Sequence, residues 1–344
     1  MNVTIKDVAK RANVAPSTVS RVISDSPKIS DITKRKVQKV MDEMGYHINL
    51  NARDLVQKSS KTIGIVMKNS TGEMLHTSFM ADVIRGISDL ARKRGFSISL
   101  ITGDTEEVIF QDAVEKVRGK RVDGMIVLYS KEGDKVVPFL LDSGVPFAMI
   151  GRPVSDSDRI MYVDNDNIQA AKDATSYLIE RGHEHIAFIG DDPDYEVAQA
   201  RMEGYNQAMA ANQLKVLDGY EKFIKFDPEE GKKAISELMG LPVTPTAIVV
   251  TDDFNALIVV SAINEMGYSI PDDVSIISFN NSVISRLANP PLTSVDTQIY
   301  QLGYESTRCV LDEIHDPSEV KRSVIIPTVI TERKSCKTHT VPLS

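Results

Sequence analysis

A short segment near the start of the chain carries side chains suited to contacts with nucleic acid. Its sequence is PSTVSR, and on a helix its small or polar residues would share one face: Pro16, Ser17, Thr18, Ser20 and Arg21. Short hydroxyl groups can bond phosphates or base edges, and Arg21 can contact a phosphate or the edge of a guanine. The segment therefore suggests a surface that fits the major groove of DNA.

The flanking residues predict the helices that would position this surface. Thr4 can cap a first helix, with Asp7 as the acidic member of a capping box. Asn13 tolerates the left-handed conformation of a tight turn and would end that helix, and Pro16 would begin the second. A third helix is expected to start after Ser30, with its lysines and arginine on the outer face.

Charge divides the chain into a basic front and an acidic remainder. The first 60 residues hold 11 Lys and Arg against 6 Asp and Glu, a net of +5, whereas the other 284 residues hold 29 against 42, a net of −13. This division favours one part that meets a polyanion and another with a different role. By charge alone, a solvated basic face without a partner would look the same.

The stretch TIKDVAKRANVAPSTVSRV, with the segment NLNARDL at residues 49–55, resembles the headpiece of the lactose/galactose repressor family, and the resemblance continues through the whole chain. It implies that the second helix reads the major groove. It also implies a hinge helix that enters the minor groove, where Leu55 wedges a base step open. The expected DNA-binding residues are Thr4, Pro16, Ser17, Thr18, Ser20, Arg21, Asn49, Ala52, Arg53 and Leu55.

So short a hinge helix is unstable alone and needs support from DNA or a second subunit. An ordinary linker or core residue is the alternative for Leu55. Asn13 departs from the glycine that is common in the family at that position, and the left-handed tolerance of asparagine accounts for the departure.

From Lys61 onward, short apolar strands alternate with amphipathic helices. The expected strands are TIGIVM, SISLIT, VDGMIVL and PFAMIG, after which the pattern begins again with IMYV, HIAFIG, TAIVV and VSIISF. This alternation implies parallel sheets covered by helices. The expected fold class is α/β: a three-helix helix-turn-helix headpiece and a hinge helix, followed by a two-lobed core like that of periplasmic binding proteins, built from doubly wound parallel sheets.

The domain boundaries follow from these patterns and from the family resemblance, which implies late crossovers between the lobes. The headpiece is expected at residues 1–47, and the hinge and linker at 48–60. The N-terminal lobe would comprise 61–163 and 294–322, the C-terminal lobe 164–293 and 323–335, and the tail 336–344.

Ligands of doubly wound sheets bind beyond the carboxyl ends of the strands, so two facing lobes predict a cleft. Polar residues follow several strands, and the resemblance adds an arginine that forks onto sugar hydroxyls and two aromatic walls. The expected effector-binding residues are Phe79, Arg201, Phe226, Asp252, Asn280 and Asp296. Helix capping is the alternative for the neighbouring Asp253 and Asn281. The residues Gly151 and Arg152 stand where lactose-type members present an acidic sugar contact, which argues against a galactoside.

The segments YVDNDN, SFNN, PPLTSVD and LNARDLV resemble the maltose-operon regulators of Gram-positive bacteria within this family. This resemblance implies a homodimeric repressor that binds a pseudo-palindromic operator in double-stranded DNA and responds to maltose or a maltodextrin. Three alternatives stay open: a global catabolite regulator whose co-effector is a phosphorylated carrier protein, a sugar-binding module without a regulatory role, and a ligand that acts as corepressor.

Other protein classes lack support in the sequence. GxSxG, P-loop, HExxH and GxGxxG motifs are absent, so an enzyme is not expected. Cys309 and Cys336 have no metal-ligand or disulfide spacing, and neither a cofactor nor a metal is expected. Without an apolar run that could serve as a signal peptide or a membrane span, the expected location is the cytoplasm and no membrane partner is expected.

Overall fold

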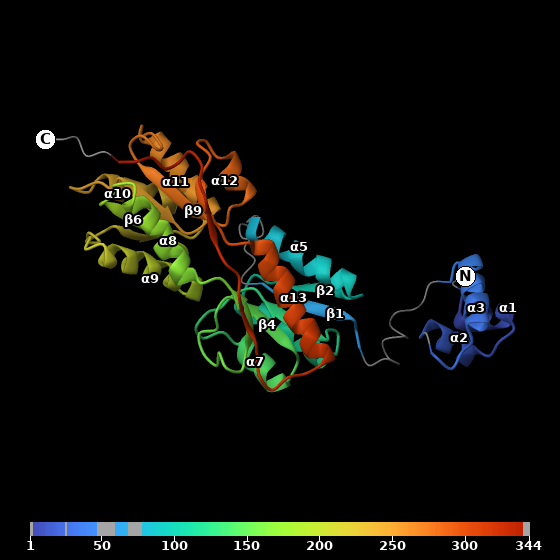
Figure 1. Ribbon diagram of the computed structural model, residues 1–344. Helices are drawn as coiled ribbons and strands as arrows, with labels where there is room; N and C mark the ends of the chain where they lie inside the picture. Colours follow the sequence, from blue (N-terminus) through green and yellow to red (C-terminus); the bar gives the residue numbers. More distant parts are fainter. Residues whose placement is uncertain (1–2, 25, 47–58, 68–77, 340–344) are drawn as a thin grey trace. The chain divides into compact units, whose positions relative to one another are not determined.

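The computed structural model describes residues 3–24, 26–46, 59–67 and 78–339. The chain divides into two compact units, with the boundary after Lys61 (Figure 1). The predicted hinge contacts Asn49, Ala52, Arg53 and Leu55 lie outside the described residues.

The first unit contains three helices in its described residues: α1 (Ile5–Ala12), α2 (Pro16–Ile23) and α3 (Asp31–Glu43). The predicted capping box is present, because the Asp7 amide donates to Thr4 Oγ1 and the Thr4 amide donates to Asp7 Oδ2. Asn13 ends α1 at φ 53°, in the left-handed region, and Pro16 is the first residue of α2. Ser30 caps α3. The predicted local signals of this unit are thus confirmed.

A small apolar core holds these helices together. Val8 of α1, Val19 and Val22 of α2, and Val37 and Met41 of α3 are buried against one another. This packing turns the opposite face of α2 outward, which is the face that carries the predicted DNA contacts.

The first lobe of the second unit is built on a parallel sheet with the strand order β11-β5-β4-β3-β1-β2. The strands are β1 (Thr62–Val66), β2 (Ser97–Ile101), β3 (Gly124–Val127), β4 (Phe147–Ile150), β5 (Met161–Asp164) and β11 (Ser323–Ile325). The helices are α5 (Ser78–Lys93), α6 (Glu106–Arg118), α7 (Val136–Ser143) and α13 (Ile299–His315). Along β3, Met125 and Ile126 belong to different apolar clusters, so both faces of this sheet are buried.

Helices α5 and α13 lie side by side although more than 200 residues separate them in sequence (Figure 1). Glycines permit this contact. A Cβ atom on Gly86 would lie 2.1 Å from the Tyr300 carbonyl oxygen, and one on Gly303 would lie 2.2 Å from the Val83 carbonyl oxygen. The two backbones therefore pack closer than any larger side chain would allow.

The second lobe is built on a sheet with the strand order β12-β10-β9-β8-β6-β7. Its strands are β6 (Ile186–Gly190), β7 (Glu221–Phe223), β8 (Ala247–Val250), β9 (Ser275–Phe279), β10 (Thr293–Asp296) and the antiparallel β12 (Val329–Thr331). Its helices are α8 (Asn167–Ile179), α9 (Glu196–Ala211), α10 (Pro228–Met239), α11 (Asp253–Glu265) and α12 (Val283–Leu287). The α/β class and the two-lobed architecture are as predicted.

Strand pairing corrects the predicted lobe boundaries. Strand β5 pairs with β4 and completes the first sheet, which agrees with the predicted lobe boundary at residue 163 but not with the expected restart of the strand pattern at IMYV. Strand β10, expected in the N-terminal lobe, pairs with β9 in the second sheet, and β11, expected in the C-terminal lobe, pairs with β5 in the first. The reason is physical: the pattern of a strand of three or four residues is too short to select one sheet, and only the pairing partner decides.

The predicted tail also begins too early. The Lys337 amide donates to Ser275 Oγ at 3.2 Å, and the His339 amide donates to the Arg181 carbonyl at 2.7 Å. Residues 336–339 therefore pack on the second lobe.

Among the described residues, no helix combines the length and apolar character that a membrane crossing requires.

Candidate functional site

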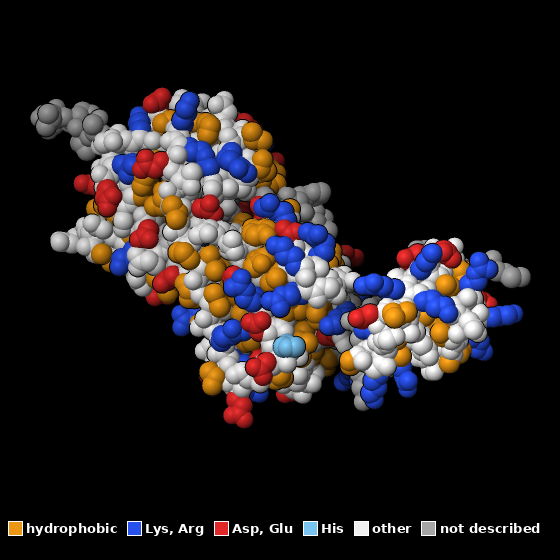
Figure 2. Space-filling view, turned by 45° about the vertical axis from the view of Figure 1, so that its right-hand side comes forward, with side chains coloured by type: hydrophobic (Ala, Val, Ile, Leu, Met, Phe, Trp, Pro, Cys, Tyr) orange, Lys and Arg blue, Asp and Glu red, His pale blue; other side chains and the backbone are white. Residues whose placement is uncertain are grey.

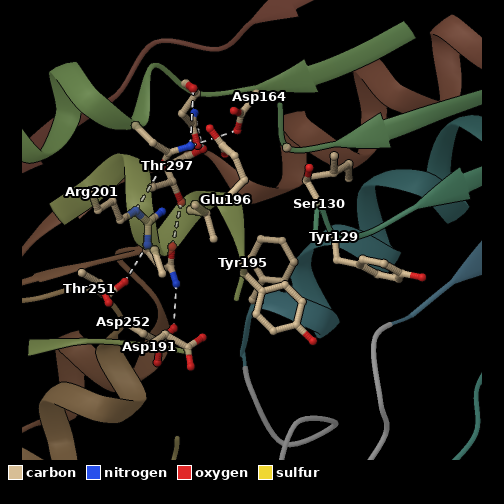
Figure 3. Close-up of a pocket in the computed structure, with 18 of the residues that line it drawn as sticks. Tyr129, Ser130, Asp164, Asp191, Tyr195, Glu196, Arg201, Thr251, Asp252 and Thr297 are labelled. Carbon is tan, nitrogen blue, oxygen red and sulfur yellow. Dashed lines mark hydrogen bonds between the residues drawn. The ribbon is translucent and has the colours of Figure 1, made fainter. Parts of the chain in front are cut away.

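A pocket lies between the two lobes of the second unit, where strands of both sheets end (Figure 3). Ser130, which follows β3, and Asp164, which ends β5, line it from the first lobe. From the second lobe, Asp191 follows β6 and Thr251 follows β8. The carboxyl ends of the strands thus converge on one cavity, as expected for facing doubly wound sheets.

Arg201 of α9 forms part of the wall of this pocket and is only 8% exposed. Its Nε donates to Asn167 Oδ1 at 3.0 Å and its Nη1 donates to the Thr251 carbonyl at 2.6 Å. The guanidinium carbon lies 4.5 Å from the ring centroid of Phe279. Burial lowers the pKa of Arg201, while the nearby Asp252 carboxylate opposes that shift. The contacts fix the plane of the fork and use two of its five N–H donors.

Asp252 and Asn280 form a hydrogen-bonded pair on the same side of the pocket. Asp252 caps α11 by accepting from the Phe254 amide at 2.7 Å, and its second oxygen accepts from Asn280 Nδ2 at 2.8 Å. Asn280 Oδ1 accepts in turn from Thr297 Oγ1 at 3.1 Å. Burial, together with the neighbouring Asp253, raises the pKa of Asp252 to about 7. These groups offer both donors and acceptors to a ligand.

Both predicted phenylalanine rings line the pocket, one from each lobe. Phe79 belongs to α5 of the first lobe, and Phe226 precedes α10 of the second. The Phe226 ring centroid lies 5.9 Å from that of Phe254. The structure therefore brings Phe79, Arg201, Phe226, Asp252 and Asn280 together around one cavity.

Asp296 does not line the pocket, contrary to expectation. Its carboxylate accepts from Asn281 Nδ2 at 2.9 Å and from the Gln298 amide at 2.8 Å. The next residue, Thr297, lines the pocket instead. Successive residues at a strand end point to opposite sides, so a shift of one position exchanges the inward residue for an outward one.

The neighbouring Asp253 has a structural role. Its carboxylate accepts from the hydroxyls of Ser278 at 2.5 Å and Ser294 at 2.9 Å, and from the Ser282 amide at 2.6 Å. Helix α11 is capped by Asp252 rather than Asp253, and Asn281 bonds Asp296 and Arg333 rather than capping a helix.

Further acidic residues of the pocket escaped the sequence prediction. Asp164 accepts from Asn167 Nδ2 at 3.0 Å, and burial raises the pKa of its carboxyl to about 6. Burial also raises the pKa of Glu196 to about 7, with the Asp164 carboxylate as the next largest cause. The same strand-end rule, applied to IMYV and HIAFIG, would have found Asp164 and Asp191.

The two lobes are hydrogen-bonded directly to each other beside the pocket. The Glu196 amide donates to the Ser130 carbonyl at 3.1 Å, and Lys131 pairs with Tyr195 as an isolated antiparallel bridge. We call residues 130–131 and 195–196 the clasp. It joins the loop after β3 to the start of α9, so the structure has its lobes closed at this edge.

In the first unit, α2 exposes Pro16, Ser17, Ser20 and Arg21, and Thr18 is half-buried. Thr4 is exposed, and its hydroxyl donates to Asp7 Oδ2 at 2.6 Å, so this side chain is already engaged in capping. Lys and Arg side chains are spread over the visible face of this unit (Figure 2). A basic surface around an exposed polar helix is the arrangement that binding to a DNA groove requires.

Comparison with protein families supports both units. Residues 4–49 match the family described as bacterial regulatory proteins, lacI family, and residues 175–336 match the periplasmic binding protein-like domain.

Full-length relatives extend this match. The transcriptional regulator MalR of Staphylococcus xylosus is 34% identical over 339 residues, which cover 98% of each chain. MalR of Streptococcus pneumoniae (strain TIGR4) is 37% identical over 326 residues, which cover 94% of this chain and 96% of the relative. A solved complex of the transcriptional regulator CelR with cellobiose superposes with a TM-score of 0.76 at 28% identity and covers 97% of this chain and 100% of its own.

Proposed function

Because the chain belongs to the lacI family of bacterial regulatory proteins, and is a DNA-binding transcriptional regulator and not an enzyme, we propose that it represses an operon for maltose or maltodextrin use. A small sugar bound between the lobes relieves this repression. The protein acts in the cytoplasm, where its operator is accessible.

The observation that carries the sugar proposal is the composition of the pocket wall. Arg201 is held rigidly by two hydrogen bonds, which suits recognition of adjacent hydroxyls by a planar fork. Asp252 and Asn280 add acceptors and a donor, and the rings of Phe79 and Phe226 offer apolar faces to a pyranose. Two relatives named MalR and a relative solved with cellobiose support a glucoside, and the MalR names favour maltose.

The DNA side of the proposal follows from the exposed face of α2. This helix lies in the major groove, where Ser17, Thr18, Ser20 and Arg21 meet phosphates and base edges and Pro16 begins the helix. Thr4 contacts the backbone near the start of α1. A homodimer presents two such helices to the half-sites of a pseudo-palindromic operator about one helical turn apart.

The hinge completes the DNA contacts in this proposal. Asn49, Ala52 and Arg53 lie along the minor groove, and Leu55 wedges open a flexible step at the operator centre. The effector changes how the paired hinges meet, and thereby shifts operator affinity by a coupling energy of about 1–3 kcal/mol.

A calorimetric titration tests the proposal. Maltose, maltotriose and cellobiose are titrated into the purified protein, with and without an operator fragment. We expect maltose or maltotriose to bind and to release the operator. Binding of cellobiose alone would exclude the maltose assignment, and tighter operator binding in the presence of sugar would make the ligand a corepressor. If operator affinity responds only to a phosphorylated carrier protein, the catabolite-regulator alternative holds; sugar binding without any operator binding would leave a sugar-binding module.

A further inference from the structure

Glu196 and Ser130 carry polar atoms into the pocket that the protein itself does not satisfy. Among the described residues, neither Glu196 Oε2 nor Ser130 Oγ has a hydrogen-bond partner, although both atoms are buried. Ser130 is only 6% exposed, and both residues line the pocket. They come from different lobes and are brought together by the clasp, in which the Glu196 amide donates to the Ser130 carbonyl at 3.1 Å.

Buried polar atoms without hydrogen-bond partners destabilise the folded protein. A buried acceptor or hydroxyl without a partner costs about 1–3 kcal/mol, and more when it is charged. Folded proteins keep few of them, and each needs an explanation. A ligand that supplies the missing hydrogen bonds provides one here, because both residues line the same cavity (Figure 3).

The charge around Glu196 specifies what that ligand can be. Among the residues that line the pocket, the carboxyl groups of Asp164, Asp191, Glu196 and Asp252 stand against one cation, Arg201. Arg152 is exposed and is not part of the pocket lining, so it adds no positive charge to the wall. This end of the cavity therefore presents an acidic surface, which attracts a hydroxyl donor and repels an anion.

Building on the proposed sugar function, we propose that Glu196 and Ser130 form a charge-selecting subsite of the pocket. A hydroxyl of a neutral sugar donates to Glu196 Oε2 and accepts from Ser130 Oγ, whereas phosphorylated and carboxylated sugars are excluded. Because the two residues belong to different lobes, the same hydroxyl ties the lobes together beside the clasp. The subsite thus makes the closed arrangement depend on an uncharged ligand.

The test compares maltose with maltose 6′-phosphate as calorimetric probes. The variants are Glu196→Gln, Ser130→Ala and the control Glu203→Gln. Glu203 lies on the same helix but is exposed and accepts from Gln207 Nε2 at 2.9 Å. We expect the wild-type protein and the control to prefer maltose by about a hundredfold, and Glu196→Gln to reduce that preference at least roughly tenfold. Ser130→Ala should weaken maltose binding about fivefold without changing the preference. Unchanged selectivity in Glu196→Gln would overturn the proposal.

A second measurement does not depend on the ligand. Burial and Asp164 raise the pKa of Glu196 from its ordinary 4.5 to about 7. The folded protein therefore keeps a proton that the unfolded chain releases, so rising pH favours unfolding between about 4.5 and 7 and the full penalty applies above 7. Without ligand, Glu196→Gln should raise the melting temperature by a few degrees at pH 8 and by progressively less toward pH 4.5, and Glu203→Gln should not.

The two measurements separate failure of this subsite from failure of the sugar assignment. If neither probe binds the wild-type protein, the maltose function is wrong, and the melting temperatures still decide whether Glu196 is held for a ligand. Loss of stability in Glu196→Gln at pH 8 would show that the carboxylate supports the fold, and would overturn the subsite.

Discussion

Arg201 and Asp253 are both buried and charged, but one lies at the pocket and the other stabilises the second lobe. Arg201 is held by Asn167 and the Thr251 carbonyl at the edge of an open cavity. Asp253 is surrounded by three donors within the second lobe and does not reach the cavity. The first residue is therefore suited to binding and the second to stability.

Replacement of Arg201 by lysine tests whether sugar affinity depends on the positive charge of this side chain or on the shape of its guanidinium group. Arg201→Lys keeps the positive charge beside Asp252 but loses the fork, so sugar affinity should fall by about 2 kcal/mol, or roughly thirtyfold, while operator affinity stays within twofold. Calorimetry and an operator-binding assay measure both quantities. The exposed Arg85→Lys, on α5, is the matched control. Normal sugar response in Arg201→Lys would remove this residue from the effector site.

Asp253→Ala should destabilise the protein by about 3–5 kcal/mol, because two buried hydroxyls and one amide lose their acceptor. Denaturant unfolding of the second unit, followed by circular dichroism, measures the effect. By comparison, Asp252→Asn retains a good helix cap and removes a repulsion with Asp253, so it should cost less than about 1 kcal/mol. Equal losses in the two variants would contradict the division of roles.

At the scale of single residues, the strand-end rule predicted where polar groups gather but not which neighbour faces the cavity. It selected Asp252 and Asn280, which line the pocket, and also Asp296, which does not. The distinction depends on the direction of one side chain at the end of β10, and the composition of the sequence does not encode it.

At the scale of elements, two helices separate the tasks of recognition and support. Helix α2 exposes its polar face because its valines pack on α1 and α3. Helix α13 packs on α5 so closely that glycine is required on both sides. The polar face of α2 therefore stays available to a partner, whereas the contacting faces of α5 and α13 are buried against each other.

Arg21→Ala on α2 should weaken operator binding by about 1–3 kcal/mol, equivalent to at least roughly fivefold. If Arg21 contacts phosphate, the salt dependence of binding should also fall by about one unit of slope; if it contacts guanine, discrimination between operators should fall instead. Fluorescence anisotropy at several salt concentrations distinguishes these outcomes. Arg11→Ala, on α1, is the comparison, and unchanged operator affinity in Arg21→Ala would exclude the residue from the interface.

Gly86→Ala on α5 should destabilise the second unit by about 2–4 kcal/mol, because the added methyl group would meet the Tyr300 carbonyl at 2.1 Å. The exposed Arg92→Ala on the same helix should change stability by less than about 0.5 kcal/mol. Thermal unfolding of both variants measures the difference. A stability of Gly86→Ala equal to that of the wild type would mean that α5 and α13 can separate without cost.

Local sequence signals predicted the first unit well and the late strands less well. The cap at Thr4, the left-handed Asn13 and the proline that begins α2 depend on neighbouring residues only. Helix α10 was not predicted, although Asp227 caps it and Pro228 opens it, and these are recognisable start signals. Strands β10 and β11 were assigned to the wrong lobes because their partners lie far away in sequence.

At the scale of the whole molecule, the chain joins a basic DNA-binding unit to a unit that contains the candidate effector pocket. Residues 1–60 carry a net charge of +5 and the remaining residues −13. This separation confines attraction to DNA phosphates to the part of the chain that carries the recognition helix.

Thermodynamic linkage between maltose and the operator gives a prediction that involves the whole protein and no single residue. If maltose weakens operator binding by a given factor, the operator must weaken maltose binding by the same factor, expected to be about 5- to 150-fold. Calorimetry of maltose into the free protein and into the operator complex measures one factor, and operator titration with and without maltose measures the other. Unequal factors would mean that the two measurements involve different oligomers of the protein.

The late return of the chain to both sheets constrains how this protein can be made. Strand β10 lies between β9 and β12 in the second sheet, and β11 extends the first sheet beside β5, yet these strands occupy residues 293–331. During synthesis on the ribosome, neither sheet can be completed until the last tenth or so of the polypeptide has emerged. The DNA-binding unit, which needs only its own first residues, can fold long before the unit that contains the pocket is complete.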